Sequence, residues 1–275
     1  MGTSSSYGGP KKRPLLPRWA TDPDELGDTE GAEVEPEGAQ QAANANGASD
    51  GSWKAAKTQM TRFAGGLGRE GLRAAATAYV SAMGGSKAAA RSAGFGRTVA
   101  RGVARFFSGV SSTGVTATMS QLGLGALAGS PVDVLIAGVA DTILQAPTSL
   151  EASAARSAML SVLASVFDKY SVEDAGLEQL DSMDAAAVRE VVTLFVQEYI
   201  YQRWLQELGS RIENKSIDKE DALRLEREVK EFIIQTVELD FEGIDVLHID
   251  WNSQQGRESM ESIFEMAYGL LEVGQ

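Results

Sequence analysis

The sequence has no cysteine and only one histidine among its 275 residues. The lack of cysteine excludes disulfide bonds, thiolate zinc sites and a cysteine nucleophile. It also suits a reducing compartment, so we expect a cytoplasmic protein. A metal site would have to be built from carboxylates, but the clusters Asp218-Lys-Glu-Asp221 and Asp240-Phe-Glu242 match neither a calcium-binding loop nor paired Glu-x-x-His motifs. We expect no metal site and no cofactor.

Catalytic patterns are also scarce. The one histidine, His248, lies near Asp245 and Asp250, but proximity in sequence does not establish the geometry of a Ser-His-Asp triad. The stretch Gly94-Phe-Gly96 lacks the third glycine of a dinucleotide-binding motif, and no lysine follows the glycine spacing of a P-loop. These absences predict a protein that is not an enzyme and that has no small-molecule substrate.

Long apolar runs are missing as well. The basic residues at 11–18 are followed by acidic ones, so we expect no secretory signal. The uncharged run 106–132 is long enough to span a bilayer and contains a Gly-x-x-x-Gly motif at Gly125 and Gly129. Because Ser, Thr and Gly recur in this run, we expect a tightly packed interior helix pair instead. A membrane-active effector that uses 106–132 is the alternative, and membrane contact is not expected.

Charge is plentiful but segregated along the chain, whose formal net charge is −13. Residues 1–20 carry only cations, residues 21–50 carry only acids, and residues 51–110 carry ten Lys or Arg against the single Glu70. The C-terminal hundred residues are again acidic. We expect the basic block to be compensated within the chain, with an anionic partner as the alternative. The net charge argues against nucleic acid as a general partner.

Residues 21–52 have few apolar residues and no aromatic ones before the chain reaches Trp53. Such a stretch cannot bury enough surface to offset the entropy lost on ordering, so we expect a disordered acidic linker. It would place an N-terminal motif peptide, residues 1–20, on a long tether. Within that peptide, Leu15, Leu16 and Trp19 form a short apolar anchor that could dock on the domain or on a partner.

From Trp53 onward, apolar residues recur three or four positions apart, which predicts an all-α fold. We expect a basic Gly/Ala-rich helical section at 53–110 and an acidic helical core at 111–275, together forming one domain. Gly209 is expected to close the longest helix, and 241–251 to be extended or a loop. Helices are predicted within 53–64, 69–83, 86–110, 131–147, 149–170, 184–208, 217–237 and 258–272.

The helix predicted at 86–110 carries a basic stripe, because its arginines lie mostly three or four residues apart. We expect a solvated face whose charges find acidic neighbours. A phosphate-binding role is the alternative, although no aromatic residues alternate with the cations as they do in single-strand binders. The stripe consists of Arg91, Arg97, Arg101 and Arg105.

The opening MGTSSSYGGP is followed by a basic run, by Pro-Leu-Leu-Pro and by Trp19-Ala20. This start resembles that of QatB proteins, components of the four-protein Qat antiphage systems of bacteria. The acidic linker, the section around GRTVARGVARFFSGV and the acidic helical C-terminal half agree with the resemblance in composition and order.

The resemblance implies three partners: an ATPase (QatA), a QueC-like enzyme (QatC) and a TatD-like nuclease (QatD). QueC-like enzymes activate a carboxy-deazaguanine with ATP and join it to an amine. By analogy with related defence systems, Gly2 would be the acceptor, and Thr3, Ser4, Ser5 and Ser6 would form the recognised peptide.

The chemistry of Gly2 agrees with this role, because removal of Met1 is favoured before a small residue. A glycine amine is uncrowded, and with a pKa of about 7.7–8.0 it is partly neutral at cellular pH. Three other interpretations stay open. The start fits the myristoylation pattern, with a polybasic segment at 11–13 as a second membrane signal. The terminus could have no role, or the protein could be an unmodified scaffold or adaptor whose acidic C-terminal helices bind the ATPase.

Overall fold

The computed structural model describes residues 52–144, 149–216, 218–241 and 243–273. Within these ranges all regular secondary structure is helical and no strand occurs, which confirms the predicted all-α class. Residues Gly51–Gln275 form one compact unit. The N-terminal motif peptide and all but the last residue of the predicted acidic linker lie outside the described residues.

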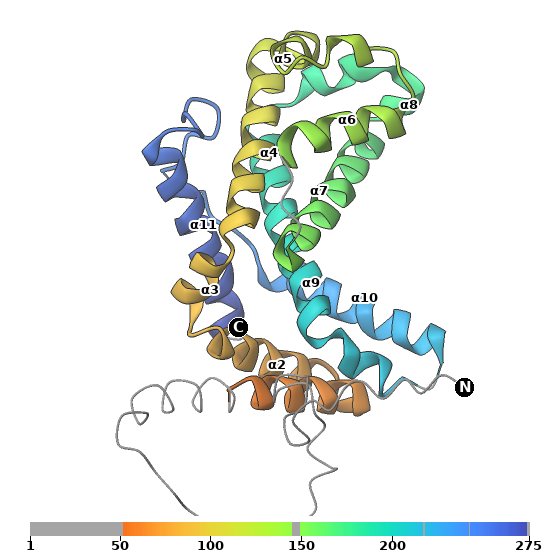
Figure 1. Ribbon diagram of the computed structural model, residues 1–275, viewed down its shortest axis with the longest axis vertical. Helices are drawn as coiled ribbons and strands as arrows, with labels where there is room; N and C mark the ends of the chain where they lie inside the picture. Colours follow the sequence, from red (N-terminus) through yellow and green to blue (C-terminus); the bar gives the residue numbers. More distant parts are fainter. Residues whose placement is uncertain (1–51, 145–148, 217, 242, 274–275) are drawn as a thin grey trace, which may run out of the picture. The chain divides into compact units, whose positions relative to one another are not determined.

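The chain is helical at 52–62 and passes into the π-helical turn η3 (Phe63–Leu67). Most of the helices that follow occupy the predicted segments, joined by short turns (Figure 1). The remaining elements are α2 (Gly68–Ala82), α3 (Ser86–Ser92), α4 (Gly94–Thr113), α5 (Val115–Gln121), η4 (Gly125–Leu127), α6 (Val132–Leu144), α7 (Leu150–Lys169), α8 (Val172–Ala175), η5 (Leu177–Ser182), α9 (Ala185–Glu213), α10 (Lys219–Thr236) and α11 (Gln254–Val273).

The helix predicted at 86–110 is in fact two helices, so that prediction was wrong. The chain breaks at Ala93, whose φ of −86° and ψ of 40° are not helical, and α4 begins at Gly94. The break frees backbone amides at the start of α4, and Glu151 of α7 accepts hydrogen bonds from two of them, Phe95 N at 2.7 Å and Gly96 N at 3.2 Å. A carboxylate at a helix N-terminus also meets the positive end of the helix dipole. The interruption therefore fixes α4 to α7.

The prediction that Gly209 closes the longest helix was also wrong, because α9 continues to Glu213. Beyond the glycine, Ile212 is fully buried, as is Leu208 before it. A glycine inside a helix costs only about 0.5–1 kcal/mol relative to alanine, which burial of one large aliphatic side chain outweighs. Tertiary packing thus carries the helix past a residue that favours its end.

Helix α9 is the centre of the fold (Figure 1). It packs against α4, α7 and α10, while α11 packs chiefly against α2, α3 and α4. The aromatic side chains of α9 are fully buried at Phe195, Tyr199 and Trp204. The ring of Tyr199 lies against Phe264 of α11 with centroids 5.5 Å apart. These contacts place the N-terminal basic helices and the C-terminal helices around one core.

The uncharged run 106–132 is divided among the end of α4, α5, η4 and the turn before α6. Gly114, Gly123 and Gly129 have φ between 75° and 86°, a left-handed conformation that favours glycine and separates these short elements. A packed helix pair does form in this run, because the end of α4 packs against α5 and buries Phe107, Val115 and Met119, but Gly125 and Gly129 are exposed and lie outside it. Among the described residues, no helix is long and apolar enough to cross a membrane.

The segment 241–251, expected to be extended or a loop, is a series of turns. Its Val246 and Trp251 are buried, and the Val246 carbonyl accepts hydrogen bonds from Ser108 Oγ at 2.7 Å and from Trp251 Nε1 at 3.2 Å. The bond from Ser108 fastens the loop to α4, and the bond from Trp251 closes the loop on itself. Since the loop runs directly into α11, they also set where that helix starts relative to α4.

Candidate functional site

The predicted modification site, Gly2 with Thr3, Ser4, Ser5 and Ser6, lies outside the described residues. The candidate sites that the structure describes are therefore those of the helical domain.

His248 and Asp245 do come together, as their spacing allowed. His248 Nδ1 lies 2.9 Å from Asp245 Oδ2, and the two side chains are 83% and 66% exposed. The hydrogen bond from His248, with a smaller contribution from the Leu247 amide, lowers the pKa of the Asp245 carboxyl. No hydroxyl nucleophile bonds to His248 within the described ranges. The pair is a solvated surface contact and does not form a triad.

Metal ligands do not gather either. Among the residues that the structure describes, no three His, Asp or Glu side chains are placed to hold a metal ion. Two of the five acids of α10 form ion pairs within that helix, because Arg224 bridges Asp221 and Glu228. Lys230 of the same helix reaches the buried Glu198 of α9 at 2.7 Å.

Two short glycine motifs in the sequence match a dinucleotide-binding motif and a hydrolase motif, but neither is accompanied by the strand that such a site requires in the described ranges. Gly66-Leu-Gly68-Arg-Glu-Gly71 spells Gly-x-Gly-x-x-Gly, but it connects a helical segment to α2, whereas a dinucleotide site requires a preceding strand. Gly47-Ala-Ser49-Asp-Gly51 spells the Gly-x-Ser-x-Gly of hydrolase elbows and lies outside the described residues. That motif functions at a strand-to-helix turn, and no strand occurs in the described ranges.

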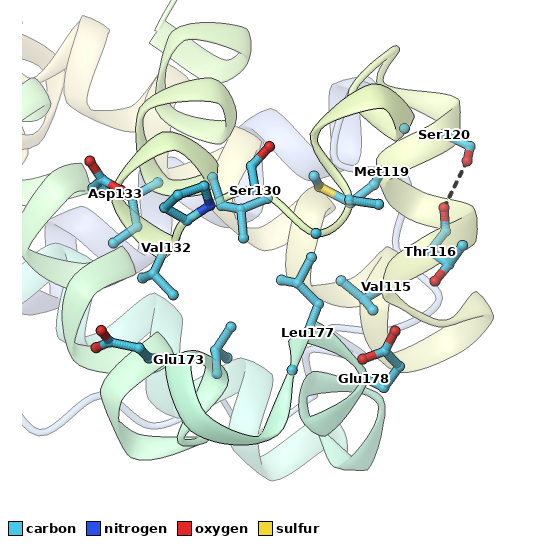
Figure 2. Close-up of a pocket in the computed structure, with 18 residues that line it drawn as sticks. Val115, Thr116, Met119, Ser120, Ser130, Val132, Asp133, Glu173, Leu177 and Glu178 are labelled. Atoms are coloured by element: carbon cyan, nitrogen blue, oxygen red, sulfur yellow. Dashed lines mark hydrogen bonds between the residues drawn. The ribbon is translucent and has the colours of Figure 1, made fainter.

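A pocket of about 700 Å³ lies among the short helices that follow α4 and α7 (Figure 2). Its lining residues come from α5 and η4, from the start of α6, and from α8, η5 and the turn between them. Its inner wall is largely apolar, and three carboxylates stand among its lining residues. The apolar wall is formed by Val115, Met119, Val132, Leu135, Ile136, Val172 and Leu177, and the carboxylates are Asp133, Glu173 and Glu178.

Local hydrogen bonds hold the walls of this pocket in place. Asp181 of η5 accepts from the amide of Val115 at 2.6 Å, which caps α5 and ties it to η5. Pro131 starts α6, and its carbonyl accepts from the amides of Val134 and Leu135. Proline is favoured at such starts because its φ is already helical. The pocket is thus built from short elements whose ends are fixed individually.

The pocket combines an apolar wall with carboxylates at its edge. Asp133, Glu173 and Glu178 are exposed and form no ion pair with any described residue. An apolar cavity edged by unpaired carboxylates favours an apolar side chain flanked by cations. Sequence reasoning missed this site, because its lining comes from five short elements with no shared motif.

A second polar cluster lies inside the bundle. Arg203 of α9 donates to Ser92 Oγ at 3.0 Å and to Glu207 Oε1 at 2.9 Å, while Tyr199 donates to Glu151 at 3.2 Å. Burial, reinforced by neighbouring acidic groups, raises the pKa of Tyr79 and of Tyr199, and burial raises that of Tyr268 to about 12. The hydroxyls of Tyr79 and Tyr268 have no hydrogen-bond partner among the described residues. The cluster links α3, α7 and α9 and is structural.

Comparison with known proteins gives the family. The family model described as "Qat anti-phage system associated protein QatB" matches residues 84–271, which is most of the helical domain. Neither the curated proteins nor the solved structures contain a match. Because the match extends from before α3 almost to the end of α11 and covers more than half of the chain, it shows the family: the chain belongs to the QatB family of proteins associated with the Qat antiphage system.

Proposed function

We propose that this antiphage component is not an enzyme, and that it is the substrate of a QueC-like partner that attaches a deazaguanine to the amine of Gly2. The observation that carries the proposal is the opening sequence MGTSSS, in a chain whose domain belongs to the QatB family.

The proposed reaction is amide formation. The partner uses ATP to convert the carboxylate of the deazaguanine into an acyl adenylate, with release of pyrophosphate. The neutral Gly2 amine then attacks the acyl carbon, the new C–N bond forms, AMP leaves and the amine loses a proton. The glycine amine suits this step because it has no side chain and because its pKa of about 7.7–8.0 leaves a neutral fraction at cellular pH.

We further propose a division of labour within the chain. Residues 1–20 present the acceptor peptide, the acidic residues 21–52 act as a tether, and 53–275 form the domain that holds the protein in its complex. A flexible chain of fifty residues has an end-to-end distance on the order of 40 Å. Such a reach allows the terminus to enter a partner's active site while the domain remains outside it.

The second candidate is an adaptor whose terminus is unmodified and whose domain binds the ATPase of the system. The carboxylate-edged pocket between α5, α6 and η5 favours this role, since its three acids are unpaired within the described residues (Figure 2). The two candidates differ in what they require of Gly2. Only the first needs a small residue with a free amine at that position.

Substitution at Gly2 separates the two candidates. In cells that carry the complete system, Gly2→Leu should abolish protection against phage, because leucine blocks removal of Met1 and crowds the amine. Gly8→Leu is the matched control: it introduces the same side chain within the same peptide and should leave protection intact. Protection by the Gly2→Leu protein at the level of the Gly8→Leu protein would reject the modified terminus and favour the adaptor.

A further inference from the structure

A groove of about 470 Å³ lies along α4, and its lining residues come from that helix, from α5 and the residue after it, from the end of α6 and from the turn before α11. Its floor depends on Gly102 of α4, because a Cβ there would lie 2.4 Å from Ile143 Cγ2 of α6. The absent side chain lets the two helices approach and leaves the arginines on either side of Gly102 at the edge of the groove. These are Arg101 and Arg105, one helical turn apart.

The groove contains cations and no acids. Its lining residues include Arg101 and Arg105 but no Asp or Glu, and neither arginine forms an ion pair with any described residue. This differs from the rest of the basic stripe, since Arg91 and Arg97 share Glu261 of α11, with Arg97 Nη1 2.6 Å from Glu261 Oε2. The expectation that the stripe finds acidic neighbours therefore holds for two of its four arginines.

The guanidinium of Arg101 is only weakly held. Its closest contacts are long bonds of 3.4 Å to the Trp251 carbonyl and to Thr98 Oγ1. Burial, followed by the like charges of Arg257 and Arg97, lowers the pKa of Arg101. Arg257 bonds to the Asn252 carbonyl and to Gln254, both neutral groups. The site thus concentrates positive charge that an anion would neutralise, with donors left over to bind it.

The other lining residues add neutral polar and apolar surface. Thr98, Thr118 and Thr142 each donate to a backbone carbonyl one turn earlier. Thr98 Oγ1 also accepts from Arg101, and Thr118 Oγ1 lies 3.3 Å from Thr113 Oγ1. Gln121 and Asn252 contribute amides, and an apolar wall is provided by Phe95, Phe106, Leu122, Ile143 and Leu144. A volume of this size lies within the range of small-molecule sites.

We propose that this groove binds a phosphorylated small molecule of nucleotide size, with Arg101 and Arg105 donating hydrogen bonds to its phosphate oxygens. Guanidinium groups match phosphate geometry bidentately, and such bonds are stronger than neutral ones. The molecule is a bound ligand and not a substrate. A small ligand fits better than nucleic acid, because the net charge of −13 disfavours binding of a long polyanion, whereas two arginines at one groove can neutralise a single phosphate group.

The test is calorimetric titration of the full chain with ADP and, separately, with inorganic pyrophosphate. We expect the wild-type protein to bind at least one of them. The Arg101→Gln/Arg105→Gln variant should bind it at least tenfold more weakly, because it loses two guanidinium groups that form charge-assisted hydrogen bonds to phosphate. The matched control is Arg73→Gln/Arg227→Gln, which removes the same charge from exposed arginines of α2 and α10 and should bind within about twofold of wild type.

Three results would overturn the proposal. The first is no binding of either probe by the wild-type protein at millimolar concentration. The second is equal weakening in both double variants, which would mean that net charge alone matters. The third is binding of an oligothymidylate in place of the small probes, which would make the groove a nucleic-acid surface. If the double variant melts at a lower temperature than wild type, the exposed Arg105→Gln alone is used, with at least threefold weakening expected.

Discussion

Gly96 of α4 lies against the ring of Tyr199 of α9. A Cβ at this position would be 2.4 Å from the ring of Tyr199, which is itself fully buried. The same residue donates its amide to Glu151, and Glu151 accepts from the Tyr199 hydroxyl. One residue without a side chain therefore allows the helix contact, the N-terminal cap of α4 and the tyrosine hydrogen bond to exist together.

Gly96→Ala should lower the free energy of unfolding by about 1–3 kcal/mol, because the Tyr199 ring must move within a closed core. Gly94→Ala is the matched control: the position is exposed, starts the same helix, and has no atom within 4 Å of a built Cβ. Urea denaturation measures both. Equal stabilities of the two variants would contradict the proposed contact.

Ionisation of Tyr268 predicts how the stability of the protein depends on pH. Burial raises its folded-state pKa to about 12, while the unfolded chain ionises near 10. The folded protein therefore holds a proton that the unfolded chain loses. This contribution to stability is complete below pH 10 and declines as the pH rises toward 12. Tyr268→Phe removes a hydroxyl that has no partner among the described residues. The variant should thus lose less stability than wild type between pH 9 and pH 11.

Melting temperatures of wild type and Tyr268→Phe at these pH values measure the difference. Lysines and other tyrosines titrate in both proteins, so only the gap between the two curves reports on Tyr268. Parallel curves would show that the hydroxyl ionises as easily in the folded state as in the unfolded chain.

At the scale of helices, the sequence pattern predicted where most elements lie but not how two of them end. The period of apolar residues runs through 86–110 without a gap, so nothing in it marks the break at Ala93. The break is stabilised by Glu151, which is more than fifty residues away in sequence. Likewise, the burial of Ile212 that extends α9 depends on neighbouring helices.

Helix ends could be predicted from the sequence where the capping or turn residues lie next to the helix end in the chain. Ser149 caps α7 by accepting from Ala152 N at 3.1 Å, and Gly84 and Gly85 end α2 with φ near 90°. Ser171 stands at the start of α8 but does not cap it. Its φ of 51° is left-handed, whereas a capping serine needs an extended conformation, and no side-chain cap bond forms.

Gly209 tests the account of α9. Gly209→Ala should stabilise the protein by about 0.5–1 kcal/mol, because the position is helical and the nearest neighbour of a built Cβ is Leu205 at an ordinary 3.8 Å. The contrasting variant is Gly114→Ala, at a φ of 86°, which should destabilise by about 1–2 kcal/mol. Thermal melting compares them. Destabilisation by Gly209→Ala would mean that the helix does end there.

For the whole molecule, sequence and structure contribute different parts of the account. The proposed acceptor Gly2 is known only from the sequence, since it lies outside the described residues. The carboxylate-edged pocket and the arginine groove are known only from the structure, because each gathers residues from separate helices. The basic stripe needs both sources of information. Its spacing was visible in the sequence, but which arginines lack an acidic neighbour depends on where Glu261 of α11 lies.

The central claim is that Gly2 is modified, and intact mass spectrometry tests it most directly. The chain would be purified after expression alone and after co-expression with an active QueC-like partner, and the N-terminal peptide would then be sequenced by fragmentation. We predict loss of Met1 in both samples and, only with the partner, an added mass equal to the deazaguanine carboxylate minus water, located on Gly2. Loss of Met1 without any addition, alongside a partner shown to be active, would contradict the claim.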